Sequence, residues 1–241
     1  MIWTLAFLLL MSILGGDSPF MVKNMDKYVK SHVVDDTRKD KVLDYLDEAK
    51  SIRKKTVKAN KSLFKEFTKL EKSRDAKQND FDKLINKIVE SQKESQGANV
   101  IAIQKSQDFI TPDEWEAIKV DIEKGFEKTA KKRAKGFKKL NKEFDKWEGK
   151  ISKTVVDKDK REQAIAAVEN LRNTYIDTKK KVQAELINHN SIIYHYKAPE
   201  EKLVALQKSY LEWIRKVFET GAATHMKLVE LTTPEEWKKI M

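Results

Sequence analysis

The chain has 241 residues, with 49 Lys and Arg against 38 Asp and Glu, and a net charge of +11. It has no cysteine, which excludes a disulfide scaffold, a zinc ribbon, an iron–sulfur site and a cysteine nucleophile. Its 7 Gly and 4 Pro are too few for the many turns of a sheet-rich enzyme, and the abundant charged residues suit long helices.

The N-terminal residues form a segment of their own. Residues 2–14 carry no charge and are followed by Gly15 and Gly16, the pattern of a secretory signal. A membrane span needs about 20 apolar residues, so an uncleaved anchor over residues 2–22 is the alternative. A buried helix of a cytoplasmic protein is the third interpretation. We expect a periplasmic or otherwise extracytoplasmic protein, with residues 1–19 as signal peptide or N-terminal membrane anchor.

Residues 20–110 are expected to form a first helical hairpin region. Apolar residues recur at helical spacing from Leu43 to Leu70, and Lys, Glu and Asp occupy the other face. The pattern lapses after Arg74, which predicts a turn with Asp80 as the N-cap of the next helix. Gly97 is expected to break that helix.

A Thr-Pro-acid-Glu-Trp sequence occurs twice, and the two copies are 122 residues apart. Each copy predicts a capping box, in which Thr accepts a bond from a free N–H, Pro suits the first helical position and Glu bonds back to the cap. We expect both copies to begin separate helices and to have a structural role. The residues are Thr111, Pro112, Glu114 and Trp115, and then Thr233, Pro234, Glu236 and Trp237.

Residues 111–241 are expected to form a second helical region, a long hairpin plus a C-terminal helix. Apolar periodicity predicts one helix over residues 113–149 and another over residues 160–196. A third begins after Pro199 and is weakened at Gly221. The predicted fold is all-α, with long amphipathic helices packed as antiparallel hairpins in an elongated helical bundle.

A weaker internal similarity relates residues 54–70 to residues 131–147, at an offset of 77 residues. The shared positions are largely lysines in a chain that is rich in lysine. This offset disagrees with the 122 residues between the capping boxes. A duplicated hairpin is therefore one interpretation of the sequence.

The sequence lacks the short motifs of enzyme sites. It has no nucleotide-binding glycine loop, no serine-hydrolase elbow and no H-E-x-x-H zinc motif. His189 and His195 are six residues apart, which places them on different sides of a helix rather than in a metal-binding pair. Carboxylate pairs stand at helix starts, where the helix dipole favours negative charge. We expect no enzyme, no metal and no cofactor.

Aromatic residues recur along the predicted helices, and core packing is the first interpretation of them. The alternative is that some line an exposed apolar strip that binds a partner. Lysine outnumbers arginine and is interleaved with acidic residues, which favours a solvated surface over nucleic-acid binding. The candidates for partner binding are Phe137, Phe144, Trp147, Tyr210 and Trp213.

The segment from Ile110 to Glu114 resembles the L-T-x-x-Q signature of the Spy/CpxP family of periplasmic stress chaperones, and the segment from Leu231 to Glu236 resembles its second copy. Both glutamates replace the family's glutamine, and Thr232 displaces Leu231 by one position. The similarity covers roughly half of the chain. It implies an ATP-independent holdase that shelters unfolding proteins on a basic, partly apolar cradle, usually as a dimer.

Three functions are compatible with these patterns. We expect an exported, non-enzymatic helical protein that binds protein partners or unfolded clients as a chaperone-like holdase, with a homodimer as one arrangement. The alternative is a membrane-tethered helical scaffold or a subunit of an envelope complex, which docks through its long helices. Binding of a polyanion through lysine-rich faces is the third hypothesis.

Overall fold

The computed structural model describes residues 24–187 and 192–241, without the side chains of residues 126–139, 186, 187 and 194. The described residues form helices joined by short connections and contain no strand, which confirms the predicted all-α class. None of the described helices is both long and apolar enough to span a membrane. The expected signal or anchor over residues 1–19 and His189 lie outside the described residues. The elements are α2 (Met25–His32), α3 (Asp36–Lys72), α4 (Gln78–Gln107), α5 (Pro112–Thr154), α6 (Lys158–Ile187), the 3-10 helix η1 (Ile192–Tyr194), α7 (Glu200–Leu231) and α8 (Pro234–Ile240).

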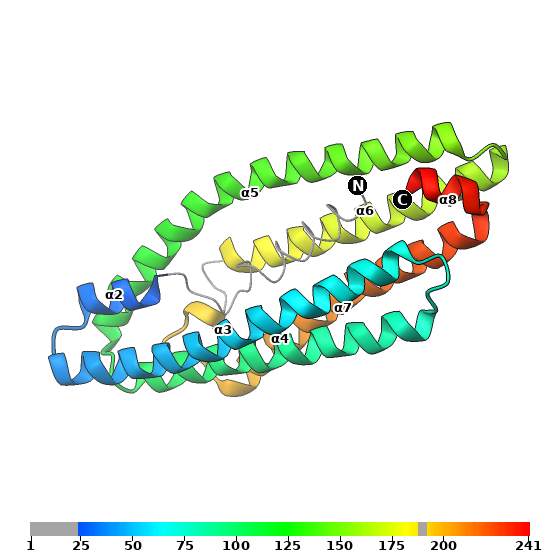
Figure 1. Cartoon of the computed structure of the whole chain (residues 1–241). Coiled ribbons are helices and arrows are strands. Elements are labelled where there is room, and N and C mark those ends of the chain that lie inside the picture. The colour runs from blue at the N-terminus through cyan, green and yellow to red at the C-terminus, as the bar shows by residue number, and fades with distance from the viewer. Residues whose placement is uncertain (1–23, 188–191) are drawn as a thin grey trace.

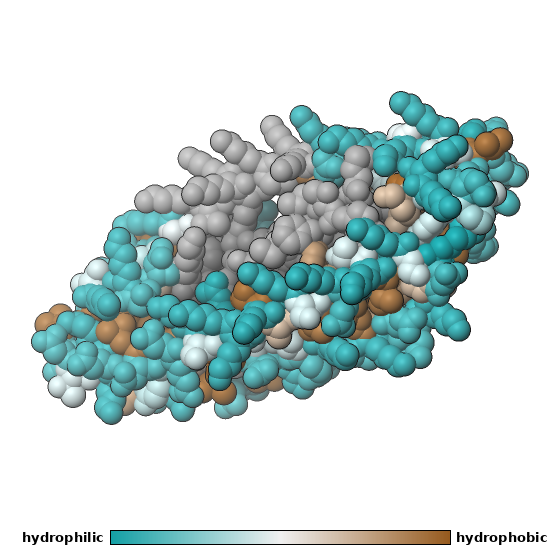
Figure 2. All heavy atoms as spheres, in the orientation of Figure 1, coloured by the Kyte–Doolittle hydropathy of each residue, from teal (hydrophilic) through white to brown (hydrophobic). Residues whose placement is uncertain are grey.

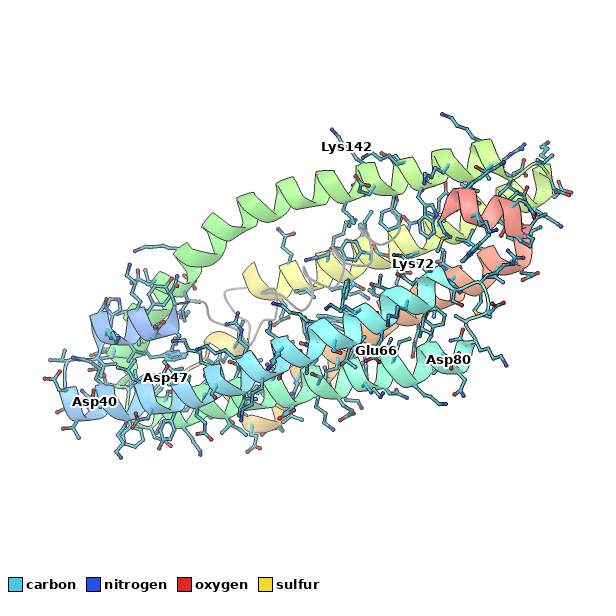
Figure 3. The ribbon with its side chains drawn as sticks, viewed as in Figure 1. Asp40, Asp47, Glu66, Lys72, Asp80 and Lys142 are labelled. Atoms are coloured by element: carbon cyan, nitrogen blue, oxygen red, sulfur yellow. The ribbon has the colours of Figure 1, made fainter. Side chains whose placement is uncertain are left out.

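Two antiparallel hairpins form the body of the molecule. α3 packs on α4, α6 packs on α7, and the hairpins join where α4 contacts α7. α5 follows one long edge, from α2 at one end of the molecule to α8 at the other (Figure 1). Charged side chains of both signs project along the first hairpin, from Asp40 and Asp47 near the start of α3 to Lys72 and Asp80 at its far end (Figure 3).

The second half of the chain repeats the fold of the first at an offset of 122 residues. The last turns of α5 therefore play the part that α2 plays in the first half, and the capping boxes lie at equivalent places. The similarity between residues 54–70 and 131–147 does not correspond to this repeat, because it relates α3 to α5, which are not equivalent helices. The equivalent bounds are Asp36 and Lys158, Gln78 and Glu200, Pro112 and Pro234 at helix starts, and His32 and Thr154 at helix ends.

Each end of the molecule has a hydrophobic core built from equivalent residues. The core at the α2 end joins residues of α2, α3, α4 and the start of α5, so the expected boundary between residues 110 and 111 does not separate two cores. The larger core extends from the middle of the molecule to the α8 end. Equivalent pairs, each residue at most 5 % exposed, are Met25 and Trp147, Val29 and Ile151, Val33 and Val155, Trp115 and Trp237, and Ile118 and Ile240.

The predicted helix breaks at glycines are wrong. α4 passes through Gly97 and ends at Gln107, and α5 passes through Gly149 and ends at Thr154. α7 is also continuous through Gly221, where a weakness rather than a break was predicted. A glycine inside a helix costs only about 1 kcal/mol relative to alanine. Burial of apolar residues on both sides of each glycine outweighs that cost.

Asp80 does not cap α4 as predicted. The helix begins three residues earlier than predicted, at Gln78, with Lys77 at the N-cap position. The carboxylate of Asp80 accepts a hydrogen bond from the backbone N–H of Lys77 at 3.1 Å. Asp80 therefore stabilises the helix start from the third helical position rather than from the cap.

Trp115 is 1 % exposed, and its replacement by Ala should create a cavity in the core at the α2 end. We expect Trp115→Ala to lower the free energy of unfolding by about 3–5 kcal/mol, measured by urea denaturation. Trp115→Phe, which keeps an aromatic ring, should cost less. A loss below about 0.5 kcal/mol for Trp115→Ala would show that the indole contributes little to this core.

Candidate functional site

Both Thr-Pro-acid-Glu-Trp sequences form capping boxes. The N–H of Thr111 donates to Glu114 Oε2 at 2.8 Å, and the N–H of Glu114 donates to Thr111 Oγ1 at 3.3 Å. The same two bonds join Thr233 and Glu236, at 2.8 and 3.2 Å. Thr111 therefore caps α5 and Thr233 caps α8, each with proline at the first helical position.

Each of these glutamates also binds a second backbone segment. The N–H of Val34, which follows α2, donates to Glu114 Oε1 at 3.1 Å. The N–H of Val156, which follows α5, donates to Glu236 Oε1 at 2.9 Å. We call these arrangements the end clasps: a glutamate at the start of α5 or α8 that binds both its own cap and the first free backbone N–H after α2 or α5, respectively.

The first end clasp contains an additional ion pair. Arg38 donates to both carboxylate oxygens of Glu114, at 2.7 and 2.9 Å, and to the carbonyl of Phe109 at 2.9 Å. The Arg38 guanidinium, with the backbone N–H groups of Thr111 and Val34, lowers the pKa of Glu114 to about 2 against its burial. At the second clasp the N–H groups of Thr233 and Val156 lower the pKa of Glu236. Both carboxylates therefore act as charged structural groups.

Each half also supplies a side chain that caps the C-terminal end of a helix in the other half. Tyr196, between η1 and α7, donates from its hydroxyl to the carbonyls of Ile110 and Gln107 at the end of α4, at 2.8 and 3.3 Å. Arg74, between α3 and α4, donates to the carbonyls of Val229 and Thr232 at the end of α7. These cross-caps satisfy carbonyls that a helix end leaves free and join the hairpins to each other.

The aromatic residues predicted as a partner surface lie mainly in the core. Phe144, Trp147 and Tyr210 are 0 %, 3 % and 1 % exposed, and their burial argues against that role. Trp213 is half-buried, and its ring contacts that of Tyr210 at 6.5 Å between centroids. Phe137 belongs to α5, but its side chain lies outside the described part of the chain.

The core at the α8 end contains two ionisable residues where the α2 end has Ile103 and Ile193. His225 is 4 % exposed, with its ring 5.0 Å from that of Phe81 and 5.1 Å from that of Trp237. Burial lowers the pKa of His225 to about 4, and burial raises the pKa of Glu71 well above its usual value. In the described ranges no three acidic or histidine side chains converge on a potential metal site.

A buried polar layer interrupts the apolar core of the first half. The hydroxyl of Ser91 donates to Asn60 Oδ1 at 3.0 Å between α4 and α3. This layer lies between the two hydrophobic cores. Its members Asn60, Gln92, Ser95 and Gln96 correspond in the second half to the apolar Val182, Ile214, Val217 and Phe218.

A groove of about 640 Å³ lies over α4 between α3 and α7, and its size is typical of binding pockets. Apolar patches interrupt the mainly hydrophilic face of the molecule in Figure 2. Ile101 is 52 % exposed within this groove. The groove is lined by Gly97, Ala98, Ile101 and Ala102 of α4, by Tyr45, Ala49 and Ile52 of α3, by Gln207 of α7, and by the charged residues Glu48, Glu90, Lys93, Glu94 and Lys105.

The small residues of this groove are specific to the first half. Gly97 and Ala98 correspond to Glu219 and Thr220 in the second half, and Ala49 and Ala102 correspond to Leu171 and Thr224. The hydroxyl of Thr224 donates to the carbonyl of Ala167 at 3.2 Å between α7 and α6, a bond that Ala102 has no hydroxyl to make. The repeated fold does not by itself require the groove.

Sequence reasoning did not find the groove. The available signal was the cluster Gly97, Ala98 and Ala102 beside the apolar Ile101, which the sequence interpretation treated as a helix end. The chain matches no protein-family model, no curated protein and no solved structure.

Replacing Glu114 by Gln should remove the ion pair with Arg38, and we expect a loss of about 2 kcal/mol of unfolding free energy at neutral pH. The pKa of Glu114 is lowered in the folded protein, so this contribution is present above pH 4.5 and is lost as the pH falls toward about 2. Urea denaturation over this pH range measures it.

The matched variant is Glu236→Gln, in which no bidentate arginine pair is lost. It should cost about 1 kcal/mol. Equal losses for the two variants, or a Glu114→Gln loss that does not depend on pH, would contradict the role assigned to Arg38.

His225 should make stability sensitive to acid. Its pKa is lowered in the folded protein, so its contribution is complete above pH 6.5 and is lost as the pH falls to about 4, with a magnitude of about 3 kcal/mol. We expect His225→Ile, which copies the equivalent Ile103, to remove this dependence. The raised pKa of Glu71 acts in the opposite direction, with stability lost as the pH rises above 4.5, so the comparison is made between variant and wild type.

The exposed His195 provides the control. His195→Gln should retain the acid sensitivity of the wild type in the same denaturation series. If His225→Ile and the wild type lose stability in parallel between pH 6.5 and 4, His225 does not titrate in the folded protein as described.

Proposed function

We propose that the chain is a non-enzymatic, chaperone-like helical protein that binds segments of other proteins in the groove over α4. The observation that carries this proposal is the apolar floor of the groove around Ile101, which the small residues Gly97, Ala98 and Ala102 flank. An exposed apolar surface inside a groove gains free energy when a partner covers it.

The end clasps and cross-caps support this function because they hold the groove's walls. α3 begins beside the first end clasp, and the end of α4 is fixed by Tyr196. A preformed groove loses little conformational entropy on binding, which favours affinity. The similarity to the Spy/CpxP family supports a holdase, although the groove differs from the basic cradle that the family implies.

Location follows from the N-terminal segment, and we propose export through residues 2–14. The second candidate is a membrane-tethered scaffold. The uncharged residues 2–14 would be the core of an anchor over residues 2–22. The elongated helical body, with equivalent structures at its two ends, would suit a scaffold. N-terminal sequencing of the protein from its native cell separates the two, because an intact Met1 supports the tether and a start near residue 20 supports export.

Blocking the groove should weaken client protection. We expect the full chain to suppress the light scattering of chemically reduced lysozyme, an assay that the cysteine-free chain tolerates because the reductant has no target in it. Ala98→Trp fills the groove floor and should weaken suppression about tenfold, a change of about 1.4 kcal/mol in binding.

The matched control is Thr220→Trp, at the equivalent position of α7 in the second half. This variant adds the same side chain at a half-buried site and should suppress scattering as the wild type does. Absence of suppression by the wild type, or equal effects of the two tryptophans, would refute binding of clients in the groove.

A further inference from the structure

The rim of the groove carries carboxylates that are not neutralised. The two lysines of the rim already have partners: Lys93 Nζ lies 4.0 Å from Glu90 Oε2, and Lys105 Nζ lies 5.4 Å from the centroid of the Tyr45 ring. Glu48 and Glu94 make no ion pair with any described residue. The groove therefore has an acidic rim on a chain whose net charge is +11.

The second half does not repeat this charge pattern. Glu48 corresponds to Asn170, and Glu94 corresponds to Lys216. The positions equivalent to Glu48 and Glu94 are therefore neutral and basic in the second half. In the first half, both carboxylates line the same groove as the exposed Ile101, so one occupant of the groove would meet the charges and the apolar floor together.

The shape of the floor favours a helical occupant. The groove follows α4 from Glu90 to Lys105, a distance of about 22 Å at 1.5 Å per residue, which matches about four helical turns. Gly97, Ala98 and Ala102 allow another helix to approach α4 closely. An extended peptide would leave its backbone groups without partners on this mainly apolar floor, whereas a helix satisfies its own.

We infer that the groove binds an amphipathic helical segment of a partner protein whose apolar stripe is flanked by Lys or Arg. The apolar stripe would cover Ile101, and the flanking cations would lie against Glu48 and Glu94. This inference rests on the proposed function and names the class of segment that the site selects.

Three fluorescent peptides test it, with the same apolar residues and with Lys, Gln or Glu at the flanking positions. Fluorescence anisotropy with the full chain should show the Lys peptide binding about tenfold more tightly than the Gln peptide, and the Glu peptide binding most weakly. The preference should shrink at high salt, because the rim carboxylates are exposed.

A charge variant and its matched control locate the effect. Glu48→Gln combined with Glu94→Gln should make the Lys and Gln peptides bind equally. Glu169→Gln combined with Glu212→Gln changes the net charge by the same amount on exposed residues of α6 and α7 and should keep the preference. Ala98→Trp should weaken binding of all three peptides.

The outcomes distinguish this inference from the proposed function. If the Lys and Gln peptides bind equally to the wild type and both are displaced by Ala98→Trp, the groove binds partners but the inferred charge selection is wrong. If no peptide binds, both proposals fail. If the chain sediments as a dimer that Ala98→Trp dissociates, the occupant is a second copy of the chain, and the inference is overturned.

Discussion

A single helix, α5, belongs to both halves of the molecule, and the rest of the structure depends on it. Its first turns complete the core at the α2 end through Trp115, and its last turns complete the core at the α8 end through Ile151. Because one rigid element enters both cores, the distance between the two ends is set by its length. The two hairpins then meet between them, where α4 contacts α7.

The two halves share their ends and differ in their middles. Equivalent glutamates, Glu114 and Glu236, close the two ends through the same backbone contacts, and equivalent tryptophans fill them. Between the ends, the apolar Val182, Ile214, Val217 and Phe218 of the second half occupy the positions of the first half's buried polar layer, and the groove lies over α4 of the first half.

Local chemistry made part of this structure predictable. The capping boxes at Thr111 and Thr233 follow from residue types at fixed spacing. Apolar periodicity identified the long helices, although it did not find α2 and it extended the helix predicted over residues 160–196 beyond the end of α6 at Ile187. Gly97 and Gly149 were wrongly predicted to end helices, because burial of the apolar residues of α4 and α5 outweighs the low helix propensity of glycine. The repeat was hard to read because equivalent core positions keep their apolar character rather than their identity, although the repeated Val-Val-Asp at Val33 and Val155 carries the same offset as the boxes. The groove could not be predicted, because it depends on how α3, α4 and α7 pack against one another in three dimensions.

The cross-caps have a consequence for how the chain can be divided. Arg74 of the first half closes α7 of the second, and Tyr196 of the second half closes α4 of the first. Each half therefore needs the other to close the C-terminal end of α4 or α7. Cleavage of the backbone near the middle of α5 would produce two fragments that each lack a closing group. Mixed together, they would reconstitute the fold by complementation, as two subunits of an intertwined dimer do.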